Sequence, residues 1–250
     1  MKTVFGFLAV VLLAGCTQSG NGQSGAGAAH SPAPRILYVA IGASDGVGVG
    51  AADPLSEAWP QVFYRTTLPE SAVMYNLSDP GLTVAGALAV EGPEALTVAP
   101  TLVTVWLNLN DLIAQVDPAD YEAQLDQLVH SMRRGGLATV LVANTPYLDR
   151  LPAYLECRAG SATRGIKCPP GLADIPPSEV NARVDAYNAA IARVVQREGA
   201  VLVDLHAGGE TPDLHPDWVS DDGFHPNGAG YAAIAATFAA TWKKTSSAQA

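Results

Sequence analysis

Ser44, Asp222 and His225 are the side chains of this sequence whose types and spacing could together perform nucleophilic catalysis. Ser44 stands in the string Gly42-Ala43-Ser44-Asp45-Gly46, just after an apolar stretch, and Asp222 precedes His225 by three residues. A serine hydroxyl becomes an effective nucleophile when a histidine accepts its proton. A carboxylate on the other ring nitrogen holds the imidazole in the required tautomer. We therefore predict a catalytic triad of Ser44, His225 and Asp222.

Gly81 and Asn110 could supply the second part of such a site, a set of hydrogen-bond donors for a negatively charged oxygen. An oxyanion is commonly stabilised by backbone N–H groups and by an Asn amide. Gly81 can present its N–H without a side chain in the way, and Asn110 carries an amide in the string Asn108-Leu109-Asn110-Asp111. Each string alone could also be an ordinary turn, because Gly, Asn, Asp and Ser are common turn residues.

Short apolar runs predict the strands that must hold these residues. The runs are continuous rather than alternating, which indicates strands covered on both faces, as in a parallel sheet. Helical patterns lie between the runs, so we predict a three-layer α/β domain whose ligands bind at the carboxyl ends of the strands. The predicted strands are 36–41, 72–77, 102–107, 139–143 and 200–205. The predicted helices are 57–67, 121–134, 179–197 and 228–242, together with a weaker segment at 83–96 that Gly92-Pro93 interrupts.

Four polar blocks of this sequence resemble, in their order, the blocks of the SGNH hydrolase family, also called GDSL-type lipases and esterases. They are the string around Ser44, the glycine Gly81, the string around Asn110, and the pair Asp222 and His225. The resemblance spans about residues 35–242 and implies a flavodoxin-like sheet of order 2-1-3-4-5. It implies that Ser44 is the nucleophile, His225 the base and Asp222 its partner. The oxyanion hole would then consist of the Ser44 and Gly81 N–H groups and the Asn110 side chain.

Two positions depart from the pattern of that family. Ala43 stands where the family usually has aspartate, and Asn108 stands where it usually has glycine. Neither change removes a catalytic atom. Asn108 adds a side chain beside the expected oxyanion site, so we expect it to narrow the pocket.

The expected activity is hydrolysis of carboxylic esters through an acyl-enzyme intermediate, without a cofactor and without a metal. Short acyl or acetyl esters of small molecules, carbohydrates or lipids are the expected substrates. The string at Ser44 also fits the nucleophile elbow of α/β-hydrolases, but that fold places its elbow after a mid-chain strand and its acid far from the histidine.

Two alternatives come from other classes of protein. A metal-dependent hydrolase could use the acidic, His-containing C-terminal third, although its spacings match no recognised ligand motif. A lipid-anchored binding protein without catalysis would not need the triad. The residues of the metal alternative are Asp204, His206, Asp213, His215, Asp217, Asp221, Asp222 and His225.

The N-terminus predicts export and a lipid anchor. Residues 1–15 combine one lysine, an apolar run and small residues, which is typical of a secretory signal. The string Leu13-Ala14-Gly15-Cys16 resembles a bacterial lipobox, which implies cleavage before Cys16 and acylation of its sulfur. Residues 16–34 are rich in Gly, Ser, Ala and Pro and would form a flexible tether. We expect a hydrolase domain at 35–250, anchored to a membrane of the cell envelope.

Charge and cysteine content complete the expectations. The formal net charge of −10, with only 14 Lys and Arg, argues against a nucleic-acid partner. Cys157 and Cys168 flank a short polar loop and are expected to form a disulfide in an oxidising compartment. They lie in the Pro- and Gly-rich segment 144–177, which we expect to be a long loop. About 215 residues suffice for one domain, and we expect a monomer.

The lipid anchor can be tested at Cys16. Metabolic labelling with a fatty-acid analogue should mark the wild-type protein and should not mark Cys16→Ser, because the variant lacks the sulfur that would carry the lipid. Equal release of the two proteins into the soluble fraction would contradict the anchor.

Overall fold

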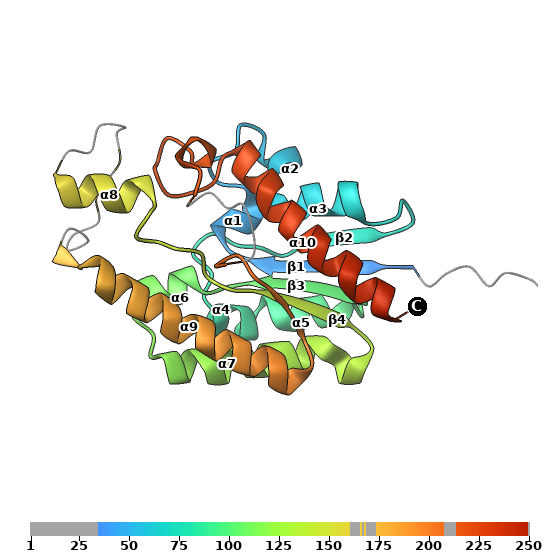
Figure 1. Cartoon of the computed structure of the whole chain (residues 1–250). Helices are drawn as coiled ribbons and strands as arrows, with labels where there is room; N and C mark the ends of the chain where they lie inside the picture. The colour runs from blue at the N-terminus through green and yellow to red at the C-terminus, as the bar shows by residue number, and fades with distance from the viewer. Residues whose placement is uncertain (1–34, 161–165, 167, 169–173, 208–213, 250) are drawn as a thin grey trace, which may run out of the picture. The chain divides into compact units, whose positions relative to one another are not determined.

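A parallel sheet forms the centre of the computed structural model (Figure 1). Among the described residues the strands pair in the order β2-β1-β3-β4-β5, which confirms the predicted fold class and strand order. The strands are β1 (Leu37–Gly42), β2 (Val73–Asn76), β3 (Leu102–Trp106), β4 (Thr139–Ala143) and β5 (Val201–Val203).

The structure describes residues 35–160, 166, 168, 174–207 and 214–249. The chain divides into the units Met1–Pro34 and Arg35–Ala250, and the sheet with its helices belongs to the second unit. The predicted signal peptide, Cys16 and the predicted tether therefore lie outside the described residues.

Helices cover both faces of the sheet, as Figure 1 shows. One face packs against α3 (Trp59–Thr67) and α10 (Gly228–Gln249), and the other against α4 (Val84–Ala89), α7 (Pro118–Arg133) and α9 (Pro177–Glu198). The shorter helices are α1 (Ser44–Val47), α2 (Pro54–Glu57), α5 (Glu91–Thr97), α6 (Leu109–Ile113) and α8 (Pro152–Ala159), with 3-10 turns at Arg134–Gly136 and Pro216–Trp218.

Alternate residues of each central strand enter two separate cores. In β1, Tyr38 and Ala40 join the core under α3 and α10, whereas Val39 and Ile41 join the core under α7 and α9. All four are fully buried. Side chains of a strand alternate between the faces of the sheet, and both faces here are covered by helices. This arrangement explains why the apolar runs are continuous in the sequence.

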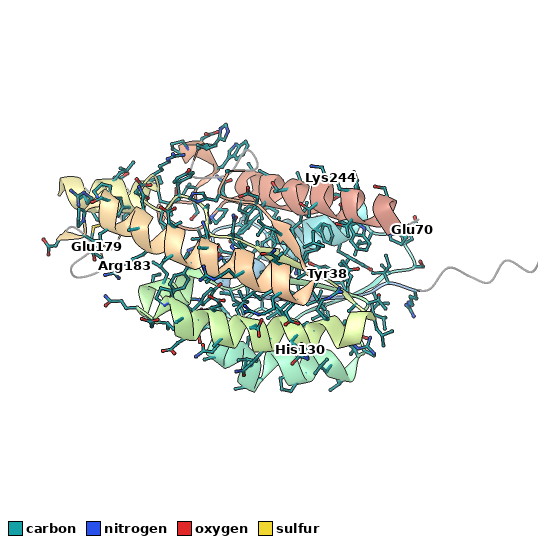
Figure 2. The ribbon with its side chains drawn as sticks, turned by 60° about the horizontal axis from the view of Figure 1, so that its bottom comes forward. Tyr38, Glu70, His130, Glu179, Arg183 and Lys244 are labelled. Atoms are coloured by element: carbon teal, nitrogen blue, oxygen red, sulfur yellow. A yellow bond between two sulfur atoms is a disulfide. The ribbon has the colours of Figure 1, made fainter. Side chains whose placement is uncertain are left out.

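Ion pairs on the outer surface join α7 and α9. Arg193 contacts Glu122 at 2.6 Å, and Arg197 contacts Asp126 at 2.8 Å. Near the beginning of α9, Glu179 and Arg183 lie one turn apart and pair at 2.6 Å (Figure 2). Exposed pairs of this kind contribute little to stability, so apolar packing holds the two helices on the sheet.

Two predicted helices are each divided, and proline explains both breaks. The predicted helix 57–67 begins only at Trp59, because Ala58 has an extended conformation (φ −56°, ψ 141°). The predicted helix 83–96 divides at Val90 (φ −126°, ψ −68°) into α4 and α5. Pro60 and Pro93 follow these points by two and three residues. A proline inside a continuous helix would collide with the carbonyl four residues earlier.

The segment 144–177 differs from the expected loop, because α8 (Pro152–Ala159) lies within it. The structure contains the predicted disulfide between Cys157 of this helix and Cys168. α10 continues to Gln249, beyond the predicted end at residue 242. Within the described part of the chain, no helix is both long enough and apolar enough to cross a membrane.

Candidate active site

Ser44, His225 and Asp222 form a continuous chain of hydrogen bonds. The Ser44 Oγ lies 2.9 Å from His225 Nε2, and His225 Nδ1 lies 2.6 Å from Asp222 Oδ2. Ser44 is the first residue of α1, directly beyond β1, and His225 precedes α10. The structure therefore brings together residues that are 181 positions apart in the sequence. Such a chain can move a proton from the serine hydroxyl to the imidazole.

A tight turn holds Asp222 against His225. The Asp222 Oδ1 accepts the N–H groups of Phe224 and His225 at 2.8 and 2.9 Å and the Ser220 hydroxyl at 2.8 Å. Burial alone would raise the pKa of Asp222, but the hydrogen bonds from His225, from the two N–H groups and from Ser220 together lower it. The carboxyl group therefore stays ionised at neutral pH and can stabilise an imidazolium.

The turn that carries Ser44 is held by Asn76, the last residue of β2, and by Ser78 just beyond it. The Asn76 amide donates to the Gly46 carbonyl at 2.7 Å. A Cβ added at Gly46 would lie 2.1 Å from the Ser78 Oγ, so only glycine permits this close approach. Because Ser44 is the first residue of a helix, its N–H has no acceptor within that helix and can bind an oxyanion.

Asn110 and Gly81 meet at a second turn, between β2 and α4. The Asn110 amide donates to the Leu82 carbonyl at 2.9 Å, and a second amide proton remains for another acceptor. Gly81 has a φ of +84°, and no atom would lie within 4 Å of a Cβ added there. The side of Gly81 that a Cβ would occupy is therefore open.

Asp111 fixes this second turn, a role that sequence reasoning missed. Both of its carboxylate oxygens lie 3.2 Å from the Val84 N–H, and only 1% of the residue is exposed. Burial raises the pKa of Asp111 to about 6, although the bond from Val84 acts in the opposite direction. Asn110 and Asp111 together connect the end of β3 to residues 82–84.

Asp45 and Asn108 line a pocket beside the triad. The wall of the pocket includes Trp106, Leu148 and Phe224. Asp45 follows Ser44 directly, and burial raises its pKa while the charge of His225 opposes the rise. Asn108 is 3% exposed, lines the pocket and donates to the Ala143 carbonyl at 3.4 Å.

Asp and His residues of the metal alternative, in the C-terminal third of the chain, make contacts with other protein groups. Asp204 accepts hydrogen bonds from the Asn144 amide and from the N–H groups of His206 and Ala207. The His206 Nδ1 lies 2.9 Å from the Thr145 carbonyl, and His215 stacks on Trp218. Asp213 lies outside the described residues. Among the residues that are described, no three His, Cys, Asp or Glu side chains gather as a metal site would require.

A parallel α/β sheet with hydrogen-bonded Ser, His and Asp beyond its strand ends is the architecture of a hydrolytic enzyme. The profile of the GDSL-like lipase/acylhydrolase family matches residues 27–233, and the chain belongs to this family. It is therefore a hydrolase that acts on esters. Among curated proteins, no sequence matches the chain.

Solved structures of similar fold agree with the family. An extracellular lipase of Streptomyces rimosus is 20% identical, with 82% of this chain and 99% of that chain covered and a TM-score of 0.60. A lipase/acylhydrolase of Enterococcus faecalis is 19% identical, with 84% and 96% covered and a TM-score of 0.61. TesA is 21% identical, with 83% and 98% covered and a TM-score of 0.61. At these identities the likeness shows a common fold.

The raised pKa of Asp111 predicts a pH-dependent stability. Between the ordinary value of 3.8 and about 6 the folded protein holds a proton that the unfolded chain has lost. The contribution of this group to the free energy of unfolding therefore falls as pH rises through that window. Asp111→Asn cannot titrate, so its stability relative to wild type should increase between pH 4 and 6 and then level off. Urea denaturation across this range, with Asp120→Asn as control, measures the difference. A difference independent of pH would contradict the assignment.

Proposed function

We propose that the protein is a serine esterase that cleaves short acyl or acetyl esters through an acyl-enzyme intermediate. Ser44 is the nucleophile and His225 is the general base. Asp222 orients the imidazole and stabilises its charged form. The observation that carries this proposal is the pair of hydrogen bonds at His225, 2.9 Å to the Ser44 Oγ and 2.6 Å to Asp222.

In the first step the Ser44 Oγ attacks the carbonyl carbon of the ester, and His225 Nε2 takes the hydroxyl proton. The carbonyl oxygen becomes an oxyanion, which accepts hydrogen bonds from the Ser44 and Gly81 N–H groups and the Asn110 amide. Donors of this kind typically lower the barrier by about 3–4 kcal/mol each. Ionised Asp222 stabilises the imidazolium that forms.

In the second step the tetrahedral intermediate collapses and the alcohol departs with the proton from His225. The acyl group now forms an ester with Ser44. A water molecule gives a proton to His225 and attacks this ester, and the same donors bind the second oxyanion. This second intermediate collapses, the bond between the acyl carbon and the Ser44 Oγ breaks, and the Oγ takes the proton back from His225 as the acid leaves.

The pocket supports a preference for short acyl groups, because the acyl group of the substrate would bind in it. Its wall includes Asp45, which follows Ser44 in the sequence, and Phe224 and Pro226, which flank His225 in the sequence. Leu148 and Leu151 also line the pocket, and they are 8% and 7% exposed. Each methylene that enters an apolar pocket adds about 0.8 kcal/mol of binding until the wall is reached.

The proposed site of action is the cell envelope. Acylation of Cys16 would hold the enzyme at a membrane, and residues 17–34 would let the domain reach ester substrates nearby. The Cys157–Cys168 disulfide supports an oxidising compartment. The proposed enzyme acts as a monomer, without cofactor or metal.

Substitution of the triad tests the mechanism. Ser44→Ala should abolish hydrolysis of p-nitrophenyl acetate and labelling by a phosphonate, because it removes the attacking oxygen. His225→Ala should lower kcat by several orders of magnitude. Asp222→Asn should lower it less, because the proton acceptor remains. Prolonged chelation should leave wild-type turnover unchanged.

Exposed counterparts serve as controls for these variants. Ser131→Ala and His130→Ala alter side chains on α7 and should keep wild-type activity. Labelling that persists in Ser44→Ala would refute the serine mechanism. Activity of Ser44→Ala that depends on added divalent metal would favour the metal alternative.

The pocket predicts how acyl-chain preference changes with its wall. Leu148→Ala removes a side chain from the wall, so the optimum of kcat/KM among p-nitrophenyl esters should move by about two carbons toward longer acyl chains. Leu96→Ala alters a partly exposed residue of α5 and should leave the optimum unchanged. An unchanged optimum in Leu148→Ala would show that the acyl group binds elsewhere.

A further inference from the structure

The turn between Asp222 and His225 is short and depends on contacts from outside. The Gly223 N–H donates to the Ser220 carbonyl at 2.9 Å, and the Ser220 N–H donates to the His225 carbonyl at 2.8 Å. Gly223 has a φ of +76°, a conformation that side chains rarely adopt. Gly223 and Phe224 separate the two catalytic side chains, so a shift of either residue changes the position of the imidazole.

α8 contacts this turn through its first residues. The Ala153 N–H donates to the Gly223 carbonyl at 2.9 Å. Ala153 lies in the first turn of α8, where N–H groups have no acceptor within the helix. The hydrogen bond therefore satisfies both groups and fixes the carbonyl of Gly223 to the helix.

Ile166 contacts the same glycine from the other chain segment. A Cβ added at Gly223 would lie 2.5 Å from the Ile166 Cδ1 and 2.9 Å from the Ala153 nitrogen. Ile166 is 8% exposed and forms a small apolar cluster with Ala153 and Cys157, against which Phe224 packs. Gly223 thus packs against Ile166 and Ala153, and no space remains there for a side chain at position 223.

The disulfide joins the two contacting segments. Cys157 is in α8, and Cys168 is two residues beyond Ile166. The Cα atoms of Cys157 and Cys168 are 5.5 Å apart. α8 has further attachments that do not depend on the disulfide, since the Tyr154 hydroxyl donates to the Ile175 carbonyl at 2.7 Å. Figure 1 shows α8 at the same end of the described unit as the beginning of α9. Loss of the disulfide would therefore release Ile166 more than it would release the helix.

We propose that the disulfide clamp, defined as α8 with Ile166 and Cys168, positions the Asp222–His225 pair for catalysis, with Ile166 as the positioning residue. This inference rests on the proposed function of the triad. Proton transfer requires the present distances among Ser44, His225 and Asp222, and a misplacement of about 1 Å can lower a rate by about a hundredfold. The clamp contacts Gly223 and Phe224, and it acts on the triad through these two residues.

The test compares variants of the clamp in the full-length protein. Ile166→Ala keeps both cysteines, and the double variant Cys157→Ala/Cys168→Ala keeps Ile166. Both should lower kcat for p-nitrophenyl acetate, and the rate of Ser44 labelling by a small alkyl phosphonate, by about tenfold. Ile166→Val should restore most of both rates, because it keeps most of the apolar contact with Gly223 and Phe224.

Matched controls separate positioning from general stability. Val129→Ala truncates a buried side chain of α7, remote from the clamp, and should label Ser44 at the wild-type rate at temperatures where it is folded. Leu155→Ala alters the exposed side of α8 and should also behave as wild type. Thermal unfolding of each variant confirms that rates are compared between folded proteins.

The outcomes are distinct. Wild-type rates in folded Ile166→Ala would overturn the proposal, even if the double cysteine variant failed to fold. Slow labelling in Val129→Ala equal to that of Ile166→Ala would overturn it as well, because lost stability would then explain both. If the wild-type protein neither hydrolyses the ester nor is labelled at Ser44, the proposed function is wrong. That result is independent of the clamp variants, so the two failures can be told apart.

Discussion

His225 can accept a proton from Ser44 only while its other ring nitrogen carries one, and the Asp222 carboxylate at 2.6 Å from Nδ1 imposes that tautomer. The remaining architecture serves this requirement. β1 ends two residues before Ser44, the proposed nucleophile. The 220–226 turn lies between β5 and α10 in the sequence and places the imidazole 2.9 Å from the Ser44 Oγ. A parallel sheet is suited to this task because the carboxyl ends of all its strands meet at one edge.

Three carboxylates near this edge have different environments and therefore different chemistry. Asp222 receives several hydrogen bonds, which lower its pKa and keep it charged. Burial raises the pKa of Asp111 and of Asp45. Asp111 fixes the turn that offers the Gly81 N–H, and Asp45 lies in the pocket wall within electrostatic reach of His225. Asp222 thus holds the His225 ring, Asp111 holds a turn, and Asp45 forms part of a pocket wall.

The sheet and the triad could be predicted from the sequence because each has a local signal. Continuous apolar runs mark buried strands, and Ser44 and His225 follow such runs in a recognisable order. The roles of Asp45 and Asp111 could not be predicted, since their pKa values depend on burial by segments distant in the sequence. The packing of α8 on Gly223 likewise arises from tertiary contacts, which composition does not encode.

The separation of Ser44 and His225 by 181 residues also has a consequence in time. Synthesis begins at the N-terminus, so Ser44, the proposed nucleophile, is made early and His225, the proposed base, is made near the end. A domain generally folds as a unit. A chain that still lacks residues 220–226 therefore cannot form the hydrogen bond between Ser44 and His225. The proposed hydrolysis becomes possible only once these last residues have packed against the end of β1.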